Sequence, residues 1–175
     1  GIRALLSGLD GSQMERLILS RNPIGDEGLA AICEADLPQL KQLVVDRCGV
    51  TNAGLKPLAS APFSKNLQWL DVSDNHLENA NFGEALALPA LQRFDVSRSG
   101  IQSVSMATLD DASLPELTYL NVGSNPIRDA GAKVIADATQ RGWKLRFLQY
   151  DPRYVKEGTK KRLEKLIPTI KEYKW

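Results

Sequence analysis

The sequence predicts an α/β solenoid, in which a short strand and a helical connector alternate along the chain. Three observations lead to this fold class. An 11-residue pattern recurs in copies that start at residues 14, 40, 67, 91, 117 and 145. Within the copies, apolar and polar residues alternate as they do in a half-buried strand. Segments between the copies, such as "GDEGLAAICEA" and "RDAGAKVIADA", have the residue pattern of helices.

The apolar positions of the copies coincide. The copies read MERLILSRNPI, LKQLVVDRCGV, LQWLDVSDNHL, LQRFDVSRSGI, LTYLNVGSNPI and LRFLQYDPRYV. Positions 1, 4, 6 and 11 are apolar in every copy, so each copy presents the same face to a shared core. Position 9 is small in the first five copies, and its side chain is expected to bond the backbone where the chain leaves the strand. The last copy departs from this rule with Arg153, as a terminal repeat can.

This pattern resembles that of the leucine-rich repeat family, L-x-x-L-x-L-x-x-N/C-x-L. Five good copies and one degraded copy cover residues 14–155. The resemblance implies a right-handed horseshoe arc of about six repeats, with a parallel β-sheet on the concave face and helices on the convex face. The helical connectors resemble those of the ribonuclease-inhibitor-like subtype, and their "GA-x-x-LA" style is similar to bacterial leucine-rich repeat proteins.

The connectors carry two recurring signals. Polar residues that favour helix starts, as caps or first-turn acids, stand near the beginning of three connectors: Asp26, Asn52 and Asp129. A glycine recurs at one connector position, where a small residue would let the helix lie close to the sheet: Gly28, Gly54 and Gly131. The fourth connector, "QSVSMATLDDASLPE", is rich in Ser and Thr and predicts a short or irregular helix.

The two ends of the chain are expected to differ from the middle. Residues 1–13 are expected to be a partial repeat, a helix without a strand of its own. Residues 156–175 predict a C-terminal capping helix and a tail, with Leu163, Leu166 and Ile167 on one helical face before Pro168. This last segment has seven Lys or Arg and three acids. That charge favours a solvated cap over a tail that binds nucleic acid or an acidic partner.

Composition excludes several classes of function. Lys plus Arg number 22 and Asp plus Glu number 21, so the net charge of +1 argues against nucleic-acid binding through bulk charge. No apolar run approaches the ~20 residues of a membrane span, so no membrane association is expected. Two cysteines and one histidine supply neither a disulfide framework nor a zinc site, so no cofactor and no metal are expected. A reducing compartment, the cytoplasm or a host cytosol, is favoured over a secreted disulfide-bonded state, and a monomer is expected.

Trp69 stands on the polar side of its strand pattern, where the core does not require it. In leucine-rich repeats, positions 3, 5, 7 and 8 face away from the core, on the concave side. Trp, Tyr and Arg are enriched at binding hot spots. A protein ligand is therefore expected to bind the concave residues Arg16, Arg47, Trp69, Asp71, Arg93, Asp95, Arg98, Tyr119 and Phe147. The alternative is local: Trp69 stacks on Arg93 as a cation–π pair, and Phe147 belongs to the C-terminal cap.

Two rival functions rest on other features. Asp71 and Asp95 are expected to be neighbours about 5 Å apart, a separation that retaining glycosidases also use. This pair is the basis of a minimal hydrolase as the alternative function, although an open sheet gives little burial to raise the pKa of either acid. A structural spacer is the second alternative. The expected function is a non-enzymatic protein–protein interaction module, alone or as part of a larger effector or regulatory protein. His76 is expected to be a surface turn residue, and the two cysteines buried structural thiols.

Overall fold

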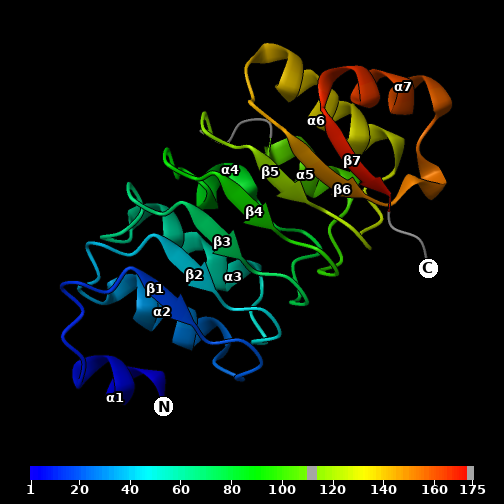
Figure 1. The fold of residues 1–175 in the computed structure, drawn as a ribbon. Coiled ribbons are helices and arrows are strands. Elements are labelled where there is room, and N and C mark those ends of the chain that lie inside the picture. Colours follow the sequence, from blue (N-terminus) through cyan, green and yellow to red (C-terminus); the bar gives the residue numbers. More distant parts are fainter. Residues whose placement is uncertain (110–113, 173–175) are drawn as a thin grey trace.

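The computed structural model describes residues 1–109 and 114–172. In these residues seven short strands form one sheet, and they lie side by side in chain order (Figure 1). The strands are β1 (Arg16–Ile18), β2 (Gln42–Val44), β3 (Trp69–Asp71), β4 (Arg93–Asp95), β5 (Tyr119–Asn121), β6 (Phe147–Tyr150) and β7 (Thr169–Glu172). Every neighbouring pair is parallel. Parallel strands need crossover connections, which the helices provide on one face of the sheet. The predicted solenoid of strand-and-helix repeats is confirmed.

The helices cover the convex face, and the opposite face of the sheet is the concave face. The helices are α1 (Ile2–Ser7), α2 (Gly25–Glu34), α3 (Asn52–Leu55), α4 (Phe82–Ala85), α5 (Ser103–Leu109), α6 (Arg128–Arg141) and α7 (Glu157–Leu166). The described residues also form two 3₁₀ turns, η1 (Lys56–Ser60) and η2 (Pro152–Tyr154). The short α5 agrees with the expected short helix in the fourth connector, whose residues 110–113 lie outside the described part. No helix in the described ranges is long and apolar enough to cross a membrane.

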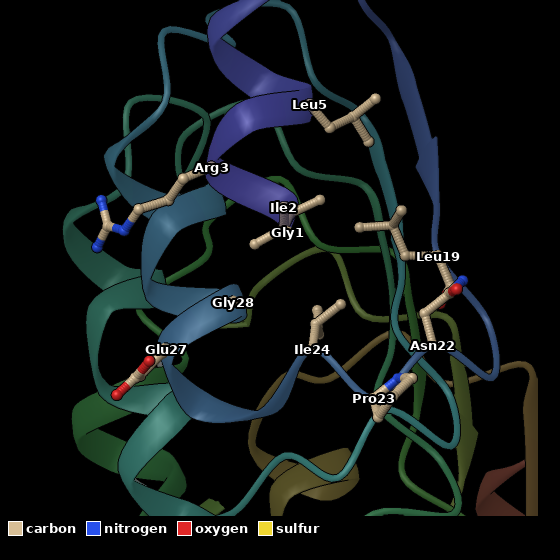
Figure 2. Close-up of a pocket in the computed structure, with 10 residues that line it drawn as sticks. All are labelled: Gly1, Ile2, Arg3, Leu5, Leu19, Asn22, Pro23, Ile24, Glu27 and Gly28. Atoms are coloured by element: carbon tan, nitrogen blue, oxygen red, sulfur yellow. The ribbon is translucent and has the colours of Figure 1, made fainter.

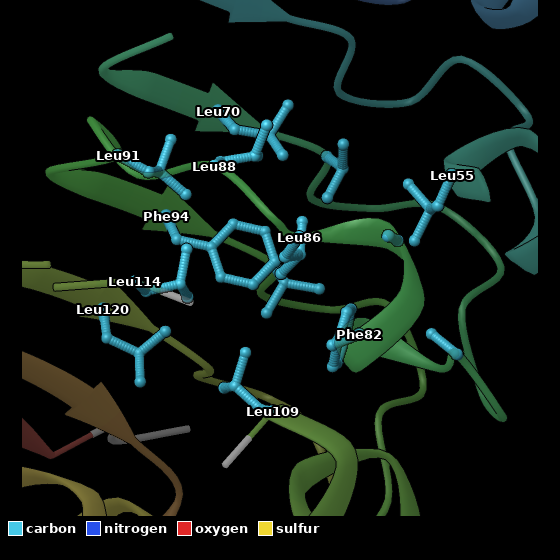
Figure 3. Packing of buried hydrophobic residues seen from close by; sticks show 14 of the residues in the cluster. Leu55, Leu70, Phe82, Leu86, Leu88, Leu91, Phe94, Leu109, Leu114 and Leu120 are labelled. Carbon is cyan, nitrogen blue, oxygen red and sulfur yellow. The ribbon is translucent and has the colours of Figure 1, made fainter. Parts of the chain in front are cut away.

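The strand register aligns the apolar columns that the sequence predicts. Position 4 runs through Leu17, Leu43, Leu70, Phe94, Leu120, Leu148 and Ile170 on successive strands. From Leu43 to Leu148 this column has no exposed surface. Phe94 replaces the leucine beside the short helix α4. Its ring meets the ring of Phe82 edge to face at 5.7 Å, so two aromatic rings fill the core of this repeat (Figure 3).

A left-handed residue and a polar residue turn the chain out of each strand. Position 8 has a positive φ in five copies: Arg21, Arg47, Asp74, Arg98 and Ser124. Position 9 then bonds the backbone, as expected. Asn75 Nδ2 donates to the carbonyls of Val72 and Val45, and Asn75 Oδ1 accepts from the backbone N–H groups of Cys48 and Val50. Asn75 therefore closes its own turn and also joins it to the preceding repeat.

The recurring acids and glycines of the connectors act between repeats. Asp26 accepts hydrogen bonds from the N–H and the hydroxyl of Thr51, both at 2.6 Å, so it holds the start of the next helix rather than capping its own. Asp129 likewise accepts from Lys156 N and Thr159 Oγ1 at the start of α7. A Cβ on Gly54 would meet the Asp26 carboxylate, so this glycine allows close contact with the neighbouring helix rather than with the sheet.

The segment after Pro168 differs from the expected tail. It forms β7, which pairs with β6 through Phe147↔Thr169 and Leu148↔Ile170 and extends the sheet to seven strands. Ile167 and Ile170 occupy positions 1 and 4 of the repeat pattern, but position 6 is Glu172. Only the first half of the motif is present, which is why the pattern did not reveal the strand. Ile167 is buried just beyond the end of α7.

Candidate functional site

Side chains on the concave face form a continuous stack of rings and cations. The guanidinium carbon of Arg93 lies 4.5 Å from the ring centroid of Trp69 and 4.5 Å from that of Tyr119. The rings of Tyr119 and Phe147 are stacked at 4.4 Å with an angle of 2° between their planes. Lys171 Nζ lies 5.7 Å from the Phe147 ring. We call Trp69, Arg93, Tyr119, Phe147 and Lys171 the cation–aromatic stack.

The stack follows from the strand register. Trp69, Arg93, Tyr119 and Phe147 are direct partners on neighbouring parallel strands, which lie about 4.8 Å apart. That spacing matches the separation of stacked planar groups, so each planar group covers the face of the next. The guanidinium of Arg93 covers one face of Trp69 and one face of Tyr119, and the rings of Tyr119 and Phe147 cover each other. Arg93 is nevertheless exposed, and the three rings are partly exposed. The cation–π pair between Trp69 and Arg93 that the sequence suggested is present.

Asp71 and Asp95 lie next to the stack in equivalent settings. They are direct partners across β3 and β4. Asp71 Oδ1 accepts from the N–H and hydroxyl of Ser73, and Asp95 Oδ1 accepts from the same groups of Ser97. Asp95 Oδ2 also accepts from Asn121 Nδ2 at 2.8 Å. Burial raises the pKa of Asp71, and the charges of Asp95 and Asp46 add to this rise, although the bonds from Ser73 oppose it. The pKa of Tyr119 is raised too, by burial and then by the charge of Asp95.

An open, polar groove of about 350 Å³ contains both acids. Its lining comes from the C-terminal ends of the strands and the following turns: Arg21, Asp46, Arg47, Asp71, Ser73, Asp74, Asp95, Ser97, Arg98, Asn121 and Gln149. The Asp74 carboxylate forms ion pairs with Arg98, at 2.8 Å, and with Arg47, at 3.5 Å. Burial alone would raise the pKa of Asp74, but the hydrogen bonds and charges of Arg98 and Arg47 hold it below its ordinary value.

The structure brings most of the expected binding residues together. Trp69, Arg93, Tyr119 and Phe147 form the stack, and the acid pair lies one row away in the groove. Arg47 and Arg98 line the groove as well. Arg16 lies apart on β1, since Gln42 on β2 separates it from Trp69.

Sequence reasoning missed further members of this surface. Lys171 was missed because β7 was not recognised as a strand. The ion pairs of Asp74 with Arg47 and Arg98 were missed because the sequence was read mainly for apolar positions. Position 8 reads Arg, Asp and Arg in three neighbouring copies, and this alternation of charge could have predicted the pairs. Asp46 was missed as well. It lies at position 7 of the repeat before the acid pair, and its negative charge contributes to the raised pKa of Asp71.

The remaining candidate groups lie outside the stack and the groove. Cys33 and Cys48 are buried free thiols, and burial raises the pKa of Cys33 to about 12. Cys48 occupies the asparagine column and its Sγ donates to the carbonyls of Leu19 and Asp46. His76 is exposed in the turn after β3. Within residues 1–109 and 114–172, no group of three or more His, Cys, Asp or Glu side chains is arranged to hold a metal ion.

Comparison with known proteins gives a consistent result. The family model described as Leucine Rich repeat matches residues 14–33 and 114–136. Ribonuclease inhibitor of Mus musculus is 29% identical over 141 residues, which cover 73% of this chain and 30% of that protein. Ribonuclease inhibitor of Sus scrofa is 36% identical over 129 residues, covering 67% of this chain and 28% of that protein. The chain thus spans less than a third of the length of these relatives.

Two further comparisons extend the range of related proteins. NACHT, LRR and PYD domains-containing protein 14 of Mus musculus is 32% identical over 139 residues, which cover 71% of this chain and 14% of that protein. The solved structure of an internalin, inlF of Listeria monocytogenes, superposes with a TM-score of 0.58 over 99% of this chain and 54% of that one, at 16% identity, and so shares the fold. Leucine-rich repeat proteins generally mediate protein–protein interaction. The seven parallel strands, the recurring apolar columns and these relatives all agree. The chain therefore belongs to the leucine-rich repeat family and to its ribonuclease-inhibitor-like group.

Proposed function

We propose that the protein is a non-enzymatic, monomeric module that binds a protein partner with its concave face. The observation that carries this proposal is the cation–aromatic stack. The stack extends over five strands, β3 to β7, and its three rings, those of Trp69, Tyr119 and Phe147, are all partly exposed. The leucine core already holds the strands together, so the stack places apolar surface towards solvent without a packing need.

The chemistry of the face supports a protein ligand. Trp, Tyr and Arg carry much of the binding energy in protein interfaces, and three of the stack residues are of these types. The half-buried acids lie one row away, so apolar and charged contacts would be made by the same partner. The ribonuclease inhibitors are named for an action on another protein, and this likeness favours a protein as the ligand here.

The experiment is an affinity capture with matched variants, followed by a binding titration with the captured partner. Trp69→Ala removes one ring of the stack. Val104→Ala is the control, because Val104 is an exposed apolar side chain on α5, on the convex face. We expect the partner to bind the wild type and the Val104 variant equally and the Trp69 variant at least about thirtyfold more weakly. Equal binding by all three would exclude the concave face, and a lack of any specific partner would favour the spacer.

A further inference from the structure

The charge of Arg93 is held in place by the stack but is not neutralised by it. Its guanidinium carbon lies 4.5 Å from the ring centroids of Trp69 and Tyr119, which stand on the strands to either side. Within residues 1–109 and 114–172, no hydrogen-bond acceptor and no carboxylate pairs with this guanidinium. A ring face attracts a cation but offers no lone pair to its N–H groups. Because Arg93 is also exposed, its donors face solvent.

Other arginines of the chain have partners within it. Arg47 and Arg98, at the groove of the concave face, both pair with Asp74. Arg3 lines a hollow of about 610 Å³ beside α1, and its guanidinium pairs with Glu34 at 2.8 Å (Figure 2). These three cations are neutralised by the chain itself. The guanidinium between the two rings is left for an anion from outside the chain.

The charges around the stack favour an anion on one side of it. Trp69 and Arg93 begin β3 and β4, and Asp71 and Asp95 end these strands. Lys171, also exposed, adds a second cation at the far end of the stack. An anion that approaches Arg93 from the C-terminal ends of the strands is repelled by the acid pair. On the N-terminal side, the residues that precede the stack on β3 to β6 are neutral or basic: Gln68, Gln92, Thr118 and Arg146.

We propose that Arg93 binds the carboxylate of an acidic side chain of the protein partner, through two parallel hydrogen bonds. This inference rests on the proposed function, because it names the group of the partner that the stack takes. Hydrogen bonds between arginine and a carboxylate are often paired in this way and are about twice as strong as neutral ones. The two rings fix the guanidinium before the partner arrives, so little side-chain freedom is lost on binding. The methylene groups of a glutamate would lie against the partly exposed rings, a contact that a chain terminus does not offer.

The test selects binders of the whole chain from short random peptides, displayed with their C-termini fused to the carrier so that only side chains supply carboxylates. Counter-selection on Trp69→Ala retains the peptides that need the stack. We expect these to share an Asp or Glu at one position. Its exchange for the amide should weaken binding to the wild type about tenfold or more, as should Arg93→Lys, which keeps the charge but loses the paired donors. On the Arg93→Lys protein the same peptide exchange should cost about threefold or less, because both changes remove one interaction.

Two controls and three outcomes decide the matter. Arg128→Lys, an exposed change on α6 at the convex face, should leave peptide binding unchanged. A selected peptide should bind equally with an amidated and a free C-terminus, and tighter binding of the free acid would assign the site to a chain terminus instead. Peptides that need Trp69 but share a Lys or Arg in place of the acid, or an equal cost of the peptide exchange on the wild type and on Arg93→Lys, would overturn this inference and leave the proposed function standing. A selection without any peptide that needs Trp69 would overturn both.

Discussion

Asn75 shows how one side chain can hold two repeats together. It is buried, and its amide group bonds five backbone groups, of Val45, Cys48, Val50, Val72 and Ser73. Three of these belong to the preceding repeat. The sequence predicted a backbone bond at this position because a small polar residue recurs there. The bridge to the preceding repeat was not predicted, since it depends on the spatial distance between neighbouring turns.

Asn75→Ala should lower the free energy of unfolding by about 2–5 kcal/mol, because it leaves several buried backbone groups without partners. Asn22→Ala is the matched control, since Asn22 is exposed and makes only local bonds. It should cost about 1 kcal/mol or less. Chemical denaturation of both variants measures the difference. Equal losses for the two would contradict the role assigned to the bridge.

Asp71 gives a prediction on pH. Its pKa is raised in the folded protein above the ordinary 3.8, chiefly by burial, so the folded state disfavours its charged form. A raised acid pKa reduces stability as pH rises through the window between 3.8 and the folded value. Asp71→Asn should therefore be more stable than the wild type at neutral pH, and the gain should vanish as pH falls below 3.8. Thermal melting of both proteins across this pH range provides the test. If Asp71→Asn is less stable than the wild type at neutral pH, the hydrogen bonds from Ser73 outweigh the effect of burial.

At the scale of elements, Asp129 on α6 holds the start of α7. It accepts from Thr159 Oγ1 at 2.7 Å and from Lys156 N at 3.0 Å, and Lys133 pairs with it at 3.0 Å. The bond from Thr159 is the main cause that lowers its pKa to about 2. The sequence placed Asp129 at a helix start, but could not show which helix it would serve, because the answer depends on how consecutive helices pack.

A lowered acid pKa contributes stability that is present above the ordinary value of 3.8 and is lost as pH falls towards about 2. Asp129→Asn should therefore be less stable than the wild type at neutral pH. Its unfolding free energy should also decline less steeply between these two values. Urea titrations at several pH values compare the slopes. Parallel slopes for the variant and the wild type would refute the assignment.

α7 closes the end of the core. Leu163 on this helix has no exposed surface, and Tyr150 at the end of β6 is almost completely buried. Leu163→Ala should cost about 2–5 kcal/mol, as other large-to-small core changes do. Lys161→Ala, an exposed change on the same helix, should stay within about 0.5 kcal/mol. The denaturant midpoints of the two variants and the wild type measure these losses. A small effect of Leu163→Ala would mean that the core does not need this helix.

At the scale of the whole molecule, the repeat makes the fold predictable and the surface only partly so. The strands β1 to β6 follow from apolar columns that recur in every copy. β7 carries only Ile167 and Ile170 of that pattern, so its place in the sheet could be learned only from the structure. The candidate row with Trp69 and Arg93 was predictable from the register. The stack itself, and the addition of Lys171, depend on side-chain geometry that a sequence pattern does not contain.

The central claim is that the concave stack serves binding and that the buried columns serve folding. The most direct test measures melting and partner affinity on the same Trp69→Ala protein. Trp69 is half-buried and contacts Arg93, so its truncation should lower stability by only about 1–2 kcal/mol, while partner affinity falls by about 2 kcal/mol or more, roughly thirtyfold. A protein that melts far lower, but whose folded fraction binds the partner as tightly as the wild type, would show that Trp69 is a packing residue and would contradict the claim.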